Sequence, residues 1–206
     1  MFNPRQTLQS LVASVALSVL SITGAAAAET YRADWRFEVL LNDKPIGFHS
    51  FSLTDDGERQ TLTTEAQFDV KVLFINAFRY RHDNTEIWGN GCLDSIDAKT
   101  DSNGDLLSVR GQRYDNAFEL EGQPGQQLPG ECVQTFAYWN PDILGSSQLL
   151  NSQTGELEDV AVTRENLDVI DVNGQTVEAI RYRLLAKSGA ITLWYSNDES
   201  RRWLAL

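Results

Sequence analysis

The sequence predicts an all-β fold: a single antiparallel domain of about ten to twelve strands, curved into an incomplete barrel or β-spiral, with one short helix. Three observations predict it. From Tyr31 onward, short runs alternate between apolar and polar residues, which is typical of half-buried strands. Turn-forming residues separate these runs at short intervals, and extended helical periodicity is nearly absent.

The first predicted strand is the run ADWRFEVLL, which places Trp35, Phe37, Val39 and Leu41 on one face. The turn NDKPIG leads back into FHSFSL, and DDGE reverses the chain again. The long run TLTTEAQFDVKVLFI keeps the alternation and continues into FRYRHDNTEIW, residues 78–88. These runs predict consecutive antiparallel strands.

Two Asn-Gly pairs predict tight β-hairpins, one within SIDAKTDSNGDLLSVRG and one within LDVIDVNGQTVEAIRYRLLA. The first pair lies in DSNGD, which imitates the start of a calcium-binding loop because Asp101, Asn103 and Asp105 alternate. Leu106 stands where such a loop needs glycine, and Gln112 stands where it needs glutamate. A hairpin turn is therefore the better interpretation. AITLWYSNDESRRWLAL predicts a last hairpin.

The middle of the chain predicts a loop followed by the short helix. EGQPGQQLPGE, residues 121–131, is rich in glycine, proline and glutamine, so we expect a loop rather than a strand. NPDILGSSQLLN follows, with Asn140 as a helix cap and Pro141 in the first helical position. We expect one short helix near residues 141–150.

The N-terminal segment predicts export. Arg5 precedes an apolar stretch over residues 11–22, and Ala26 and Ala28 supply the small residues of a cleavage site. We expect a signal peptide, residues 1–28, cleaved after Ala28, and a single exported β domain over residues 29–206. The apolar stretch is too short for a membrane-spanning helix, and no longer one follows. The mature chain is expected to be soluble and not membrane-spanning.

The net charge and the cysteine content restrict which binding partners and cofactors we expect. The formal net charge of −12 disfavours nucleic acid and anionic surfaces at long range. Cys92 and Cys132 are the two cysteines, and in an exported chain we expect them to form a disulfide. Neither belongs to a CxxC motif, and His49 and His82 are the two histidines. We expect no metal and no cofactor.

The run FRYRHDNTEIW presents two contrasting faces if it is a strand. Tyr80, His82, Asn84, Glu86 and Trp88 share the face expected to point inward, whereas the intervening residues include two arginines and an aspartate. Inward polar side chains are costly unless they are paired or hydrated. Three interpretations follow: a satisfied polar network, the lining of a ligand cavity, or a catalytic site.

A catalytic or metal pair of His82 and Glu86 would need a helix, because only there do residues four apart meet. On a strand they stand about 13 Å apart, too far to share a proton or a metal. Each would need a partner from another strand. The sequence contains no recognised nucleophile or phosphate-binding motif either.

The segment FAYWNP adds a second group of candidates. Its rings, including Tyr138 and Trp139, could stack on a sugar or an acyl chain. Rings that bury such large areas are more often part of a core. We keep Tyr138 and Trp139 with the five inward residues of the strand as candidate ligand-binding residues.

Read in order, KPIGFHSF, FRYRHDNTEIW, GCL, DSNG, FAYWNP, LLNSQTGE and ITLWYS resemble a Gram-negative family of exported proteins defined as a domain of unknown function. More loosely, the chain is similar to envelope-integrity proteins whose strands wind into an open β-spiral stapled by a disulfide. The resemblance implies periplasmic residence and an envelope role. It assigns no catalytic residue.

Two functional hypotheses follow. The first is a non-catalytic periplasmic envelope protein that binds an amphiphilic, acyl-type ligand or a protein partner on its concave face. The second is an enzyme acting on an envelope lipid or glycan, with His82 and Glu86 transferring protons. A carboxylate from another strand within hydrogen-bond reach of His82, beside an open pocket, would favour the enzyme.

Overall fold

The computed structural model describes residues 30–72, 75–115, 117–121, 127–128 and 132–206. The predicted signal peptide, residues 1–28, lies outside this part of the chain, as does most of the predicted loop at 121–131. No helix within the described ranges is long and apolar enough to cross a membrane.

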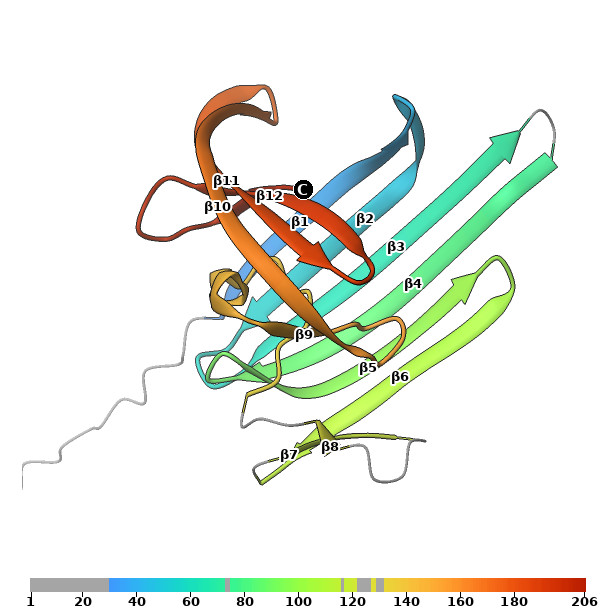
Figure 1. The fold of residues 1–206 in the computed structure, drawn as a ribbon, viewed down its shortest axis with the longest axis vertical. Coiled ribbons are helices and arrows are strands. Elements are labelled where there is room, and N and C mark those ends of the chain that lie inside the picture. Colours follow the sequence, from blue (N-terminus) through green and yellow to red (C-terminus); the bar gives the residue numbers. More distant parts are fainter. Residues whose placement is uncertain (1–29, 73–74, 116, 122–126, 129–131) are drawn as a thin grey trace, which may run out of the picture.

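The described strands between Tyr31 and Leu128 form one antiparallel sheet in which each strand pairs with the next (Figure 1). This large sheet has eight strands in sequence order, the last only two residues long. The strands are β1 (Tyr31–Leu41), β2 (Lys44–Asp55), β3 (Gln60–Val72), β4 (Ile75–Gly89), β5 (Cys92–Ser102), β6 (Asp105–Tyr114), β7 (Ala117–Leu120) and β8 (Gln127–Leu128).

The last third forms a five-stranded antiparallel sheet in the order β13-β12-β11-β10-β9. This small sheet lies across one face of the large sheet in Figure 1, and the long strands of the large sheet extend past it. Its strands are β9 (Gln148–Leu150), β10 (Leu157–Val172), β11 (Gln175–Ala186), β12 (Gly189–Ser196) and β13 (Trp203–Ala205).

The all-β prediction is confirmed, but the predicted curvature is not observed. In the described strands neither sheet closes or curls, and the chain forms two open sheets instead of an incomplete barrel or β-spiral. Turn spacing predicts hairpins, whereas closing a sheet also requires bends and a consistent shear between strands. Here the inner face of the large sheet is covered by a second layer.

The two Asn-Gly hairpins form as predicted. Asn103 and Gly104 connect β5 to β6, and Asn173 and Gly174 connect β10 to β11. All four have positive φ, the conformation that tight hairpin turns require and that asparagine and glycine adopt most readily. The interpretation of DSNGD as a hairpin is therefore confirmed.

The predicted helix near 141–150 is shorter than expected. It is the 3-10 helix η1 (Pro141–Gly145), capped by Asn140, whose side chain accepts a hydrogen bond from the backbone N–H of Asp142. Gly145 ends it, and residues 148–150 become β9 because they pair with β10. The predicted loop at 121–131 likewise contains the short strand β8, which pairs with β7.

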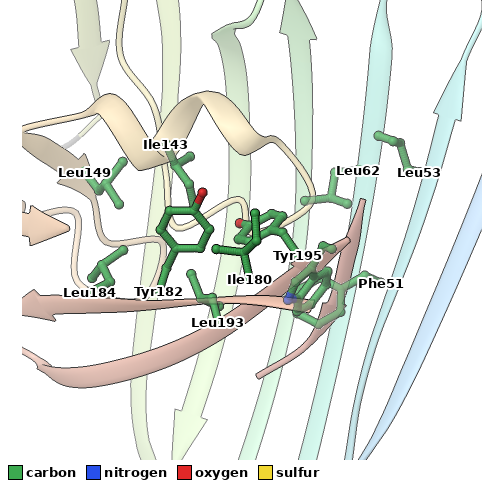
Figure 2. Close-up of a cluster of buried hydrophobic side chains, with 11 residues drawn as sticks. Phe51, Leu53, Leu62, Ile143, Leu149, Ile180, Tyr182, Leu184, Leu193 and Tyr195 are labelled. Atoms are coloured by element: carbon green, nitrogen blue, oxygen red, sulfur yellow. The ribbon is translucent and has the colours of Figure 1, made fainter. Parts of the chain in front are cut away.

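The interior contains two apolar clusters. The first lies between the two sheets, where side chains of β2 and β3 meet η1 and strands β11 to β13; Figure 2 shows Ile143 and Leu149 close to Tyr182 and Leu184. The second contains Trp88 and side chains of β5 to β9. In the large sheet, β4 lies between β2 and β3, which contribute to the first cluster, and β5 to β8, which contribute to the second.

Residues 132–140, here called the crossing segment, connect the large sheet to η1. A disulfide joins Cys132 to Cys92 at the start of β5, which confirms the predicted pairing. Beside it, the backbone N–H of Leu93 donates to the carbonyl of Val133 at 2.9 Å. Thr135 then forms a parallel bridge with Leu150, so the first four residues of this segment are tied to β5 and to β9.

Removing the disulfide should lower stability, because it closes a loop with a sequence separation of 40 residues. The loop-closure entropy corresponds to at most about 4 kcal/mol. We expect a Cys92→Ala, Cys132→Ala double variant to melt several degrees below wild type, measured by circular dichroism. Reductant should lower the melting temperature of wild type and leave that of the variant unchanged. Equal melting temperatures for both proteins would contradict this.

Candidate functional site

A cavity of about 480 Å³ lies between the inner face of β2 to β4 and the segments that cover it. Its floor includes His49 and Phe51 from β2 and Thr64 and Ala66 from β3. A larger groove of about 870 Å³ runs beside β1 and the approach to β13, but nine of its twenty lining residues are exposed and none of them belongs to β4. The smaller cavity contains most of the predicted inward face of β4, so it is the candidate site.

Strand register explains why polar side chains gather on the cavity floor. Asn84 on β4 pairs with Thr64 on β3, and His82 pairs with Ala66, which in turn pairs with His49 on β2. Paired residues in a sheet point to the same face. Polar residues at alternate positions of β4 are therefore placed beside polar residues of β2 and β3.

Glu86 occupies the innermost part of the site and is 2% exposed. Its carboxylate accepts hydrogen bonds from Asn84 Nδ2 at 2.9 Å, Trp88 Nε1 at 3.0 Å and Thr135 Oγ1 at 3.1 Å. Burial raises the pKa of Glu86, and these three hydrogen bonds oppose that rise. Thr135 belongs to the crossing segment, so Glu86 connects β4 to the cover of the cavity.

The two histidines of the site are uncharged at neutral pH. Burial, together with the smaller effect of the nearby His82, lowers the pKa of His49 to about 4. Burial also lowers the pKa of His82, although Asp83 opposes this. His82 Nδ1 lies 2.9 Å from the hydroxyl of Thr100 on β5. The partner of His82 is thus a hydroxyl group and not a carboxylate.

Two buried polar atoms in the cavity residues have no hydrogen-bond partner among the described residues. They are Asn84 Oδ1 and His49 Nε2. Asn84 is 5% exposed, and its amide nitrogen is already bonded to Glu86. An unpartnered buried polar atom is costly and rare in folded proteins. These atoms therefore indicate a place where a bound molecule could complete the hydrogen bonding.

The cavity is covered by three short segments. The crossing segment supplies Thr135, Phe136 and Tyr138, and a turn at residues 151–154 and the β11–β12 turn form the rest of the rim. Glu158 holds the two turns together. It accepts hydrogen bonds from the side chain of Asn151 at 2.7 Å and from the backbone N–H of Ser188 at 2.8 Å.

A row of stacked rings leads from the cavity toward solvent. Tyr80 stacks on Phe68 with ring centroids 5.1 Å apart and on His82 at 6.3 Å. Phe78 continues the row, 6.5 Å from Tyr80, and is 37% exposed. Burial raises the pKa of Tyr80 to about 12, so its hydroxyl keeps its proton. The site thus changes from polar at Glu86 to aromatic at Phe78.

The opposite face of β4 is outside, as predicted. Arg79 forms an ion pair with Asp101 at 2.9 Å, and Arg81 forms one with Asp69 at 2.9 Å. Arg81 is half-buried and also donates to two backbone carbonyls, while Asp83 is exposed. Because His82, Asn84, Glu86 and Trp88 are at most 5% exposed, the predicted register of this strand is confirmed.

The structure brings together five of the seven candidate ligand-binding residues. Trp88 and Trp139 instead pack edge to face in the second apolar cluster, with their ring centroids 5.7 Å apart. The indole of Trp88 points toward Glu86, to which it donates a hydrogen bond, and lies under the crossing segment. The residues that line the cavity are Tyr80, His82, Asn84, Glu86 and Tyr138.

Sequence reasoning missed the residues that other segments contribute. Thr64, Ala66 and Phe68 lie on one face of the TLTTEAQFDV run, but only the pairing of β3 with β4 reveals that this face lines the cavity. Thr135 has no periodic signal, because it belongs to an irregular segment. The turn at 151–154, with the sequence NSQT, carries the composition of a loop and nothing that identifies a rim.

His82 and Glu86 lie on the same face of β4 but have different hydrogen-bond partners. His82 and Glu86 are not hydrogen-bonded to each other, and the carboxylate that would support the enzyme hypothesis is not beside His82. Within the described ranges, no three His, Cys, Asp or Glu side chains are grouped so that they could hold a metal ion. The fold and site define an all-β protein with a polar and aromatic cavity between two sheets.

Residues 37–206 match the family model described as a domain of unknown function (DUF6134), and the chain belongs to this family. The expectation that the chain belongs to a family defined as a domain of unknown function is thereby confirmed. A comparison with curated proteins gave no match, and neither did one with solved structures.

Substituting Glu86 should destabilise the fold. Glu86→Ala leaves the donors of Asn84, Trp88 and Thr135 buried without an acceptor, so we expect a loss of about 1–3 kcal/mol in the free energy of unfolding. Arg79→Ala, on the outer face of the same strand, should cost less than about 0.5 kcal/mol because its ion pair is exposed. Urea denaturation measures both. Equal effects would argue against the Glu86 network.

Glu86 should also make stability depend on pH. A raised pKa means that the folded state holds the proton more tightly than the unfolded state, so stability falls as pH rises above the ordinary value of 4.5 toward the raised pKa. We expect wild type to lose stability relative to Glu86→Gln over this interval. Taking the difference between the two proteins cancels the histidine contributions. If the difference in the free energy of unfolding between the two proteins stays constant from pH 4.5 to neutral pH, the raised pKa of Glu86 is refuted.

Proposed function

We propose that this protein is a non-catalytic binding protein of the cell envelope that holds an amphiphilic, acyl-type ligand in the cavity between its two sheets. The observation that carries this proposal is the cavity lining, where unpartnered polar atoms of Asn84 and His49 lie at one end of a row of stacked rings. A molecule with a polar head and an apolar tail complements both parts.

The size of the cavity supports a small molecule. About 480 Å³ lies within the usual range of roughly 300–1,000 Å³ for ligand pockets, which are mostly apolar with a few polar groups that fix orientation. A protein partner was the other expected occupant. Such a partner would have to insert a side chain beneath the crossing segment, so a small amphiphile is the simpler occupant.

The proposed location is the periplasm of a Gram-negative cell. The disulfide between Cys92 and Cys132 indicates an oxidising compartment. The expected signal peptide and the resemblance to envelope-integrity proteins support export and an envelope role.

Native mass spectrometry of protein purified from bacterial periplasm tests the proposal. We expect an adduct whose mass corresponds to a single-chain or double-chain amphiphile. Ala66, 2% exposed on the cavity floor, offers a blocking variant, because Ala66→Phe fills the space beside His49 and His82. Thr63→Phe places the same ring on the exposed face of the same strand and serves as the control.

The adduct should be lost in Ala66→Phe and retained in Thr63→Phe, with both variants showing a cooperative thermal transition. If Ala66→Phe does not fold, addition of monolauroylglycerol to delipidated wild type provides the second measurement. Failure of wild type both to retain an adduct and to bind that added amphiphile would sink the proposal.

A further inference from the structure

We infer that the cavity receives its amphiphile head first and selects an uncharged head group that donates hydrogen bonds, such as a hydroxyl-bearing one, over an anionic head group. The inference rests on the proposed function and specifies its ligand. It follows from the charges, the unpartnered acceptor and the position of the aromatic row in the site.

The charges of the lining disfavour an anion. Its described residues include no lysine and no arginine, and Glu86 is its acidic member. The basic side chains nearest along β4, Arg79 and Arg81, are on the opposite face and paired with aspartates. A carboxylate or phosphate head would therefore lose its hydration without gaining a cation, which is costly in a buried site.

The hydrogen-bonding groups favour a donor. Asn84 Oδ1 is an acceptor without a partner, since the amide nitrogen of this residue is used by Glu86. One hydroxyl group can donate to that oxygen and accept a hydrogen bond from His49 Nε2 when that nitrogen carries the proton. A head group with a second hydroxyl can instead donate to Nε2 in the other tautomer. An ester without hydroxyls can only accept.

A cationic head is less well matched. Glu86 is the acidic group of the described lining, and its two oxygens already accept three hydrogen bonds from Asn84, Trp88 and Thr135. A buried ammonium needs a charged partner that is free to meet it. His49 and His82 supply none, because both rings are neutral.

The aromatic row fixes the direction of the ligand. The most buried polar group is Glu86, and exposure increases along β4 through Tyr80 to Phe78, which stacks on Tyr80 and is 37% exposed. Phe68 and Tyr80 are nearly parallel, with 10° between their planes, and present an apolar surface for an alkyl chain. The head then lies at Asn84, and the tail extends over Tyr80 and Phe78 toward solvent.

Four probes with the same alkyl chain test the selectivity: monolauroylglycerol, methyl laurate, laurate and laurylamine, each titrated calorimetrically into delipidated wild type below its micelle-forming concentration. We expect monolauroylglycerol to bind about tenfold more tightly than laurate or laurylamine and about fivefold more tightly than methyl laurate. In Asn84→Leu, the affinity for monolauroylglycerol should fall to that for methyl laurate, and the latter should not change.

The outcomes separate the two claims. If none of the four probes binds, the proposed function fails together with its ligand assignment. If laurate, laurylamine or methyl laurate binds as tightly as monolauroylglycerol, the cavity still binds amphiphiles and the inferred head-group selectivity is overturned. The wild-type ranking decides this even if Asn84→Leu does not fold. A folded Asn84→Leu that keeps the full preference for monolauroylglycerol would also overturn it.

Discussion

The structure depends on the accommodation of a buried carboxylate between two apolar clusters. Glu86 is placed inward by the register of β4, and an inward carboxylate is tolerated only where donors surround it. Asn84 and Trp88 come from the same strand, but Thr135 must be delivered from a distant part of the chain. The course of the crossing segment is therefore tied to this one side chain.

The disulfide helps to place Thr135 beside Glu86. Cys132 is anchored to Cys92, and the hydrogen bond from Leu93 to Val133 extends the anchor by one residue. Two residues later Thr135 reaches Glu86, and the segment continues through Phe136 and Tyr138, which cover the cavity. The covalent link thus fixes both the closure of the polar network and the position of the cavity cover.

Sequence patterns predicted the local features well and the long-range ones poorly. The alternation in FRYRHDNTEIW identified the inward face, and the Asn-Gly pairs identified two hairpins, because both signals depend on residues close in sequence. The second sheet, the crossing segment and the cavity depend on contacts between distant strands. Trp88 and Trp139 show the limit: the sequence grouped both with the candidate ligand-binding residues, and only packing reveals that they meet each other outside the cavity lining.

The inward face of β4 combines two roles that the sequence presented as alternatives. At the Glu86 end the side-chain donors of Asn84, Trp88 and Thr135 all reach the carboxylate, Glu86 is 2% exposed, and the crossing segment closes over it, which describes a structural network. From Asn84 outward the pattern changes: an acceptor has no partner, the wall opens into a cavity, and rings replace polar groups. Asn84 belongs to both parts, since its nitrogen is bonded to Glu86 and its oxygen is unpartnered. Because the network fixes the amide in place, the acceptor is already held in position, which would lower the entropy cost of the proposed binding.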